Sequence, residues 1–534
     1  MRTFLFKLIK MKKLKLGSIA IALACAAPSF AGGLLTNTNQ NVAFNRMMSR
    51  EASIGIDGVY YNPAGVVFMG DGHHLSINWQ LAYQTRTIKN DYALFTNNVN
   101  NSTTPRDFKG EAFAPVIPSF QYAYNKGKWS FQANFALAGG GGKCTFDNGL
   151  GSFEKIVAET AMGACQLASG IDQVGAAVGQ AMGLPIPSRL FSSDAAFGAD
   201  GKYSYDSYMH GRQYYFGLSV GAAYRVSDNF SAFAGVRGVY ATCNYYGYVR
   251  DIKVGAMPLY QVLDPTKSDA ANIELSCDQS GLGFTPILAV DYKTGKWNFA
   301  AKYEFKTRMR LKNKAVNQAP SIGNLADNLK GAYIQAGIPE AAANAILGNE
   351  NVTAAMGQLK SQFDQKLGAA IGEYEDGKKI AGDIPAYLAI GAGYKPIDAL
   401  RINVGFHWFD DKHATSYNDR QKLLKRGTLE WNAGAEYDVC KKLTVSAGWQ
   451  NTNYGISDEY MEDRSFVVGS NSVGGGAVVH LTDKMHLNVA YFHTFYQHKK
   501  MEEKVQLTAD KSLSYSSDFT RNNNVFALGL DIDF

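Results

Sequence analysis

The chain ends in the sequence VFALGLDIDF, Val525 to Phe534, and this stretch decides the fold. Its large apolar side chains share one face: Phe526, Leu528, Leu530, Ile532 and Phe534. Small or acidic residues occupy the positions between them. Because successive side chains of a β-strand point to opposite faces, this stretch predicts a strand with an apolar medium on one side only.

The same alternation recurs upstream, and the connections between the strands show what the strands build. We expect fourteen strands, near residues 72–84, 113–125, 128–138, 211–226, 230–247, 281–292, 297–312, 384–395, 400–411, 428–438, 442–452, 472–481, 485–498 and 523–534. Every second connection is a tight turn, such as Lys126-Gly127, whereas the others run from about 16 to about 70 residues. Short turns at one end and long loops at the other predict an all-β fold, a 14-stranded antiparallel transmembrane β-barrel.

Composition excludes several other classes of protein. The 534 residues include 54 Gly, and only 19% are charged. Beyond the N-terminus no apolar run reaches the roughly 18 residues of a membrane helix, which argues against a helical membrane protein. The net charge of +6 is spread along the chain, so no nucleic-acid partner is predicted.

The N-terminus has the pattern of a secretory signal peptide. Basic residues from Lys7 to Lys15 precede a short apolar run, Leu16 to Ala27, and small residues at Ser29 and Ala31 suit cleavage. We therefore predict a signal peptide over residues 1–31, and a multi-pass protein of the bacterial outer membrane. The barrel is expected over residues 72–534.

Residues 32–71 lie between the signal peptide and the first strand, and they lack strand alternation. Fourteen strands enclose more space than wall side chains alone can fill. We therefore expect residues 32–71 to form a plug, or hatch, inside the lumen. Within it, Asn62-Pro63-Ala64 is either a site that sets where the plug blocks the path or only a turn before the first strand.

This segment also carries a family resemblance. The run Asn41 to Arg46, then Ser49-Arg50-Glu51-Ala52, then Tyr61 to Gly65 resembles the N-terminal hatch of FadL-type transporters, which carry long-chain fatty acids and other hydrophobic compounds across outer membranes. The resemblance implies a monomeric, plugged barrel, a substrate groove in the extracellular loops and a lateral exit through the wall. Outer-membrane lipid and lipopolysaccharide are the expected surroundings.

One strand is unusually basic. Between Trp297 and Lys312, aromatic residues take one parity and cations the other, which predicts that the cations line the lumen. Candidates for binding a ligand's polar head group are Lys302, Lys306, Arg308 and Arg310, together with Arg237 and Arg401 on other strands. The alternative is that these cations pair with acidic residues of the plug or of neighbouring strands.

Two long loops carry apolar residues at helical spacing. Ile156 and Leu167 in the first loop, and Ile346, Leu347 and Phe363 in the second, either line a groove that captures the ligand or pack together to cap the barrel. In the family, a kink in the third strand opens the wall sideways. Gly139, Gly140 and Gly141 are candidates for that opening, although they could equally be a flexible start of a loop.

No chemistry of catalysis or of metal binding is evident in the sequence. The His residues are scattered, no Ser has an elbow motif, and the five cysteines of the mature chain lack C-x-x-C spacing, so neither an enzyme nor a cofactor is expected. In an oxidising compartment, Cys243 is expected to pair with Cys277, and Cys144 with Cys165.

The predicted function is passive uptake of hydrophobic compounds, above all long-chain fatty acids, captured by the loops and released past the plug. Two other classes of protein remain open. One is a porin-like channel for small polar solutes, and the other is a surface or adhesion barrel.

Overall fold

The computed structural model describes residues 34–321, 323–357, 360, 372–508 and 511–534. The predicted signal peptide, residues 1–31, lies outside the described residues. No helix within these ranges has the length and apolar character that a membrane crossing requires.

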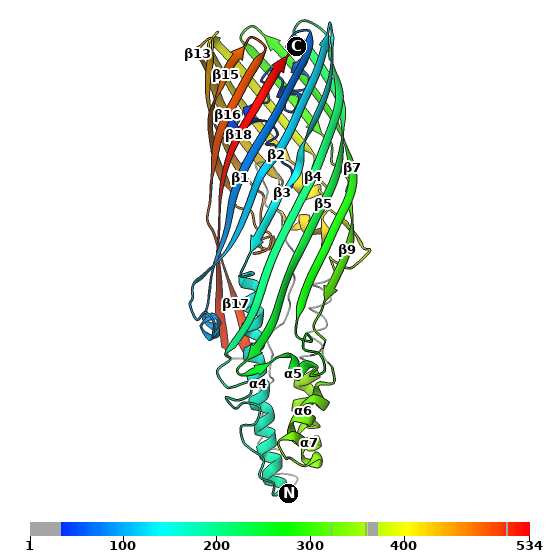
Figure 1. Ribbon diagram of the computed structural model, residues 1–534, viewed down its shortest axis with the longest axis vertical. Coiled ribbons are helices and arrows are strands. Elements are labelled where there is room, and N and C mark those ends of the chain that lie inside the picture. The colour runs from blue at the N-terminus through cyan, green and yellow to red at the C-terminus, as the bar shows by residue number, and fades with distance from the viewer. Residues whose placement is uncertain (1–33, 322, 358–359, 361–371, 509–510) are drawn as a thin grey trace.

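The described strands join into one closed antiparallel sheet (Figure 1). They are β1 (Gly72–Tyr92), β2 (Arg106–Lys126), β3 (Trp129–Phe146), β4 (Tyr203–Arg225), β5 (Phe230–Val254), β6 (Met257–Pro258), β7 (Ile273–Thr294), β8 (Trp297–Glu304), β9 (Arg310–Gln318), β10 (Lys379–Ala381), β11 (Tyr387–Ile397), β12 (Leu400–Phe409), β13 (Thr428–Cys440), β14 (Leu443–Asn453), β15 (Ser470–Thr482), β16 (Met485–Tyr496), β17 (Lys499–Thr508) and β18 (Lys511–Asp533).

Fourteen crossings result, because three pairs of segments are each one interrupted strand: β8 with β9, β10 with β11, and β16 with β17. The short β6 belongs to a loop. β1 pairs with β2 on one side and with β18 on the other, which closes the barrel. The predicted 14-stranded barrel is confirmed, and its tight turns gather at one end (Figure 1).

The wall has an apolar outer face and a polar inner face. On β7, the outward Leu282 and Phe284 are 68% and 70% exposed, whereas the inward Thr285 and Asp291 are 2% and 0% exposed. A closed barrel with an apolar outer band and a polar lumen is the architecture of bacterial outer-membrane proteins. This confirms the predicted location.

Helices lie beyond the barrel at the end that carries the long loops (Figure 1). The first of them, α4 (Gly151–Met182), is packed against α6 (Leu325–Gln335) and α7 (Glu340–Leu347), and α5 (Tyr260–Leu263) lies beside α6. Both loops with apolar residues at helical spacing are therefore helical in their described parts. Since tight turns face the periplasm in such barrels, these helices face the outside of the cell.

The basic strand is not one uninterrupted strand. Regular pairing stops after Glu304 and resumes at Arg310. Before the break, the even-numbered Lys302 and Glu304 point inward and are buried; after it, the odd-numbered Met309 and Leu311 are the buried residues. The break shifts the strand by one position, so every later side chain changes face.

The disulfide predictions are wrong for this structure, because all five described cysteines are free. Cys243 stands opposite Gln279, and Cys277 stands opposite Tyr245, so the two cysteines are two positions out of register. Such diagonal neighbours are separated by about 7–8 Å, which is beyond the reach of a disulfide. Cys144 lies in β3, while Cys165 of α4 donates its thiol hydrogen to the Phe197 carbonyl oxygen at 3.2 Å.

Candidate functional site

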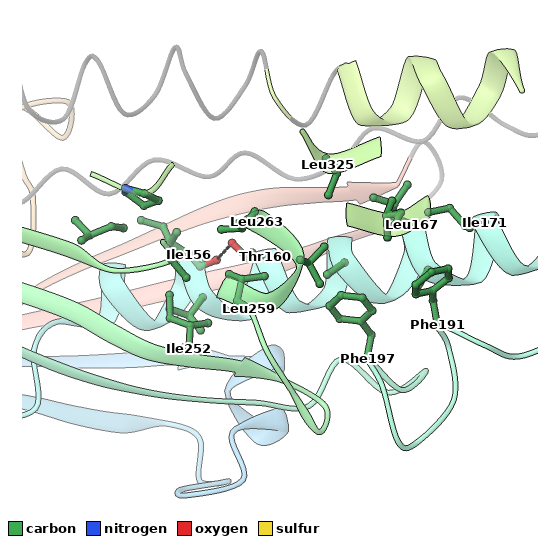
Figure 2. A pocket seen from close by; sticks show the side chains of 18 residues that line it. Ile156, Thr160, Leu167, Ile171, Phe191, Phe197, Ile252, Leu259, Leu263 and Leu325 are labelled. Carbon is green, nitrogen blue, oxygen red and sulfur yellow. Dashed lines mark hydrogen bonds between the residues drawn. The ribbon is translucent and has the colours of Figure 1, made fainter. Parts of the chain in front are cut away.

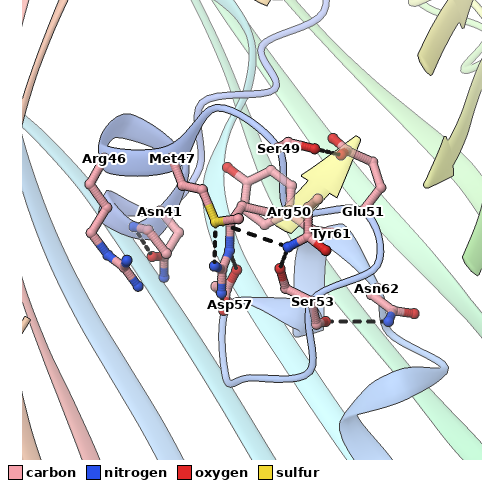
Figure 3. Close-up of polar contacts among 12 residues, drawn as sticks. Asn41, Arg46, Met47, Ser49, Arg50, Glu51, Ser53, Asp57, Tyr61 and Asn62 are labelled. Atoms are coloured by element: carbon pink, nitrogen blue, oxygen red, sulfur yellow. Dashed lines mark hydrogen bonds and ion pairs between the residues drawn. The ribbon is translucent and has the colours of Figure 1, made fainter. Parts of the chain in front are cut away.

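Residues 34–69 fold as a compact plug inside the lumen (Figure 3). It contains α2 (Val42–Met47), α3 (Gly58–Tyr61) and the short 3-10 helix η1 (Gly65–Phe68). The Asn41 side chain caps α2 by accepting a hydrogen bond from the Ala43 amide at 2.7 Å. The Arg50 guanidinium holds the turn before α3 by donating to both oxygens of Asp57, at 2.7 and 2.9 Å. The expected plug is therefore present.

Buried ionic contacts join the plug to the wall. Arg46 and Arg50 of the plug both reach Glu436 of β13, with Arg50 Nη1 at 3.1 Å from its carboxylate. His407 of β12 lies between two carboxylates: it contacts Glu51 of the plug at 2.6 Å and Glu430 at 2.8 Å. Because these charged groups are almost completely buried, each depends on its partner for its stability.

The triplet Asn62-Pro63-Ala64 attaches the plug to three separate strands. Asn62 Nδ2 donates to Asp291 of β7 at 2.6 Å. The Pro63 carbonyl accepts from Gln132 of β3 at 2.7 Å, and the Ala64 carbonyl accepts from Ser231 of β5 at 2.7 Å. These bonds fix the plug at the turn end of the barrel, so the triplet does more than form a turn.

A row of three glycines forms the seat of α2. Gly434, Gly448 and Gly474 stand directly opposite one another on β13, β14 and β15. A Cβ atom at Gly434 or Gly448 would collide with the Met47 carbonyl oxygen, and one at Gly474 would collide with the backbone of the same helix. The wall therefore lacks side chains where the plug backbone approaches most closely.

Three of the head-group candidates, Arg237, Lys302 and Arg401, lie on the inner face of the wall, and all three are already paired. Glu304 lies 2.7 Å from Arg237 Nη1 and 3.0 Å from Lys302 Nζ. Lys302 also donates to the Tyr60 carbonyl oxygen of the plug at 2.6 Å. Arg237, Lys302 and Glu304 are each at most 4% exposed, so both cations already have a partner and help to hold the plug in place.

The prediction that Arg308 and Arg310 line the lumen is wrong, because the break after Glu304 turns both outward. Both are exposed, and Arg310 contacts Asp383 at 3.0 Å. Lys306, within the break, donates to the His413 carbonyl at 3.0 Å. Arg401 lies near the turns, where it contacts Asp438 at 2.6 Å.

An apolar cavity lies between the extracellular helices and the loops beside them (Figure 2). It contains about 890 Å³ of space that is partly open to solvent. Ile156 and Leu167 of α4 line it, as predicted, opposite Phe197, Ile252 and Leu259. Among the described lining residues none is charged, and Thr160 supplies the only side-chain hydroxyl. Such a lining suits an uncharged apolar molecule.

The predicted groove residues of the second loop have other positions. Ile346 and Leu347 of α7 are buried, at 0% and 7% exposure, within the core that also contains α4. They pack the helices together and do not line the cavity. Phe363 lies outside the described residues. The second loop contributes Pro320, Leu325 and Leu329 to the cavity lining instead.

A second cavity, of about 1730 Å³ including open solvent, occupies the lumen on the loop side of the plug. Its described charged lining comprises the carboxylates Glu373, Asp383, Asp411 and Glu462 and the guanidinium groups of Arg420 and Arg464. Both arginines bind Glu462. Burial raises the pKa of Glu373 to about 6 and that of Asp411 to about 6, so both remain mostly ionised at pH 7. Carboxylates thus outnumber cations here.

The wall is interrupted between β2 and β3. Pairing of the two strands stops at Ala112 and resumes at Phe120. Pro115 and Pro118 lie in this interval and have no N–H to donate to a neighbour. On β3, the register against β4 shifts around Gly139, and Gly140 has a φ of 77°. The predicted glycines thus lie at the interruption. The alternation pattern gave no sign of this interruption, whereas the two prolines mark it in the sequence.

The plug's first residues take the place of the missing strand partner. Gly140 donates its amide hydrogen to the Leu35 carbonyl oxygen at 2.9 Å, and the Asn37 amide donates to the Ala138 carbonyl at 3.0 Å. Inside the gap, Ile117 and Leu137 join an apolar cluster with Phe44 and Tyr60 of the plug. The interruption therefore opens onto apolar surface at the level of the outer band.

Within the described ranges, no group of three His, Cys, Asp or Glu side chains is arranged to hold a metal ion. No protein-family profile matches the chain, and no curated protein sequence is detectably similar.

Solved structures are similar in fold. A Pseudomonas aeruginosa FadL homologue superposes with a TM-score of 0.55 at 14% identity, over 94% of this chain and 100% of that chain. The Pseudomonas putida toluene transporter TodX gives 0.50 at 13% identity, over 94% and 100% of the two chains. At these identities the likeness establishes the FadL-type barrel fold, in agreement with the predicted resemblance.

Proposed function

We propose that this FadL-type barrel takes up hydrophobic compounds passively across the outer membrane and acts as a transporter, not as an enzyme. The observation that carries the proposal is the gap between β2 and β3, where no strand pairing holds the two strands together between Ala112 and Phe120. A hydrophobic molecule gains free energy by leaving sideways into lipid, at about 25 cal/mol per Å² of apolar surface removed from water. A polar solute gains nothing by that route.

The two cavities supply the earlier steps of the proposed route. The apolar cavity between the extracellular helices collects the molecule, and the lumen cavity then receives it on the loop side of the plug. Leu35 lines the lumen cavity and also bonds to β3 at the gap. Displacing residues 35–37 would thus connect the lumen cavity with the exit. A porin-like channel, by contrast, needs the lumen that the plug fills.

Within this function, the charges favour neutral compounds over carboxylates. The apolar cavity offers no cation among its described residues, and the lumen cavity has more carboxylates than guanidinium groups. Arg237 and Lys302 already share Glu304. In the described lining of these two cavities, the carboxylate of a long-chain fatty acid would meet only guanidinium groups that already bind Glu462, so its burial there has a substantial desolvation cost. An alcohol or hydrocarbon has no such cost.

Restoring backbone donors at the gap is expected to slow transport. Pro115→Val with Pro118→Thr returns two N–H groups to β2, and each new ladder hydrogen bond contributes about 0.5–1.5 kcal/mol. We expect uptake of a labelled hydrocarbon into liposomes to fall about tenfold. The control is Pro286→Val, because Pro286 lies on β7, away from the β2–β3 gap, and is paired with Val236 of β5. Equal rates for the double variant and the wild type would remove the gap from the route.

Replacing the arginines tests ligand charge. Arg308→Met, on the outer face, is expected to leave uptake of a fatty acid and of its alcohol unchanged in liposomes of neutral lipid. Arg237→Met breaks a contact beneath the plug and should change both rates by the same factor. The two ligands are measured side by side on each variant. A loss of about tenfold or more confined to the acid would show that the arginine binds its carboxylate.

A further inference from the structure

The break after Glu304 creates a basic strip on the outer face of the barrel. The strip consists of Arg308, Arg310, Lys312 and Lys314 on β9 and its approach, with Lys379 on β10 directly opposite Lys312. All five side chains are exposed.

Their outward direction follows from the residues between them. Thr307 bonds to the inward Thr285, and a Cβ at the inward Gly283 would collide with Met309. Leu311 lines the lumen cavity. Since alternate side chains of a strand take opposite faces, the cations at the intervening positions lie outside the barrel.

The basic strip begins where the lipid-facing band ends. On the same crossing, the outward Phe305 is 41% exposed and is followed within three positions by Arg308. On the neighbouring β7, the outward apolar residues run up to Leu282, and polar Ser280 comes next, opposite Lys312. The strip lies on the side of this band that is nearer the loop end of the barrel. It therefore lies at the height of the lipid head groups of the outer leaflet.

Most of the strip has no acidic partner. Within the described part of the chain, Arg308, Lys312, Lys314 and Lys379 make no ion pair, and only Arg310 has one, with Asp383. The nearest acid in register is Asp278, opposite Lys314, which accepts a hydrogen bond from Asn244 at 2.8 Å. Lys312 and Lys379 face each other, and like charges at facing strand positions repel one another, so a bound anion would stabilise the arrangement.

We propose that the basic strip binds the phosphate groups of lipopolysaccharide in the outer leaflet. Lipopolysaccharide presents phosphates at the junction between acyl chains and sugars, which is the height of the strip. Arg308 suits bidentate contact with a phosphate, and the lysines add point charges along the strand. This site concerns the lipid around the barrel and is independent of the transport route.

The test compares binding of purified lipopolysaccharide with that of the same material after its phosphates have been removed. The variant Arg308→Gln/Lys312→Gln/Lys314→Gln spares Arg310 and its contact with Asp383. The control Lys126→Gln/Lys441→Gln/Lys484→Gln removes the same charge from exposed positions at the periplasmic turns. Binding is measured by titration into detergent-solubilised barrel whose folding is verified by its heat-dependent gel mobility.

We expect affinity for intact lipopolysaccharide to fall at least about tenfold in the strip variant, because each basic residue near an anionic surface contributes measurably. It should be unchanged in the control, and dephosphorylated material should bind wild type and strip variant equally weakly. Equal affinities of wild type and strip variant would overturn the proposal, as would an equal loss in the control. Binding of phosphatidylglycerol vesicles as tight as that of lipopolysaccharide would also overturn it.

Discussion

A barrel that lacks residues 34–60 is expected to fold and to leak small polar solutes. The wall strands satisfy their backbone hydrogen bonds within the sheet, so they do not need the plug to form. Removal of the segment takes out the contact of Arg46 with Glu436 and that of Glu51 with His407, and an unfilled lumen of fourteen strands is a water-filled passage. Conductance in planar bilayers should rise from near zero to that of an open pore.

The deletion leaves Asn62, Pro63 and Ala64 in place, so the remaining plug residues stay attached to β3, β5 and β7. Swelling of liposomes in a sugar solution supplies a second measure of the leak. Unchanged conductance in a correctly folded deletion variant would mean that residues 34–60 do not block the lumen.

Glu436→Gln is expected to loosen the plug, whereas Arg401 of the wall, which also contacts Glu436 at 3.2 Å, retains Asp438. The substitution leaves Arg46 and Arg50 buried without their shared carboxylate, and breaking such a buried pair costs about 3–5 kcal/mol. Arg50 retains Asp57, so Arg46 bears most of the loss. We expect brief openings in conductance records and faster proteolysis of the plug in the purified protein.

The neighbouring Asp438→Asn supplies the matched control. Asp438 lies two positions further along β13 and contacts Arg401 and Thr444 of the wall, with no bond to the plug. Adding Arg46→Gln to Glu436→Gln removes the orphaned charge and should restore part of the closure. Openings of equal frequency in Glu436→Gln and Asp438→Asn would show that the contact with the plug does not hold it shut.

The wall could be predicted from sequence because its side chains alternate between apolar, facing lipid, and polar or small, facing the lumen. Where lipid lies outside and polar groups lie inside, as at Phe526 and Ala527, parity alone assigns the face of each side chain. The plug was predictable for a different reason: fourteen strands leave a space, and residues 32–71 had no other place in the pattern.

The same parity rule failed beyond the apolar band. Met309 and Leu311 continue the apolar parity of Phe305, but at their height the outside is the polar head-group layer and the inside holds the apolar core under the loops. The sequence alternation continues unchanged, but the break after Glu304 moves the strand by one position and turns these apolar side chains inward. Alternation alone does not reveal such a break. In the lipid-facing part of β2, only Pro115 and Pro118 indicated that backbone hydrogen bonds are missing. They do not show whether the lost partner strand is β1 or β3.

The disulfides failed for a related reason. The sequence led us to expect that Cys243 pairs with Cys277, but a disulfide depends on the exact residue register between β5 and β7. That register is set by pairing along twenty positions, and no local signal near either cysteine reports it.

The glycine row on β13, β14 and β15 has a consequence for the order of assembly. Its three members come from separate strands and form a continuous bare surface only when those strands are paired in register. Until then, no complementary surface exists for the backbone of α2, although the plug emerges first from the ribosome. Docking of α2 must therefore follow the pairing of strands that are synthesised more than 380 residues later. A plug in its native position thus indicates that this part of the wall is correctly formed.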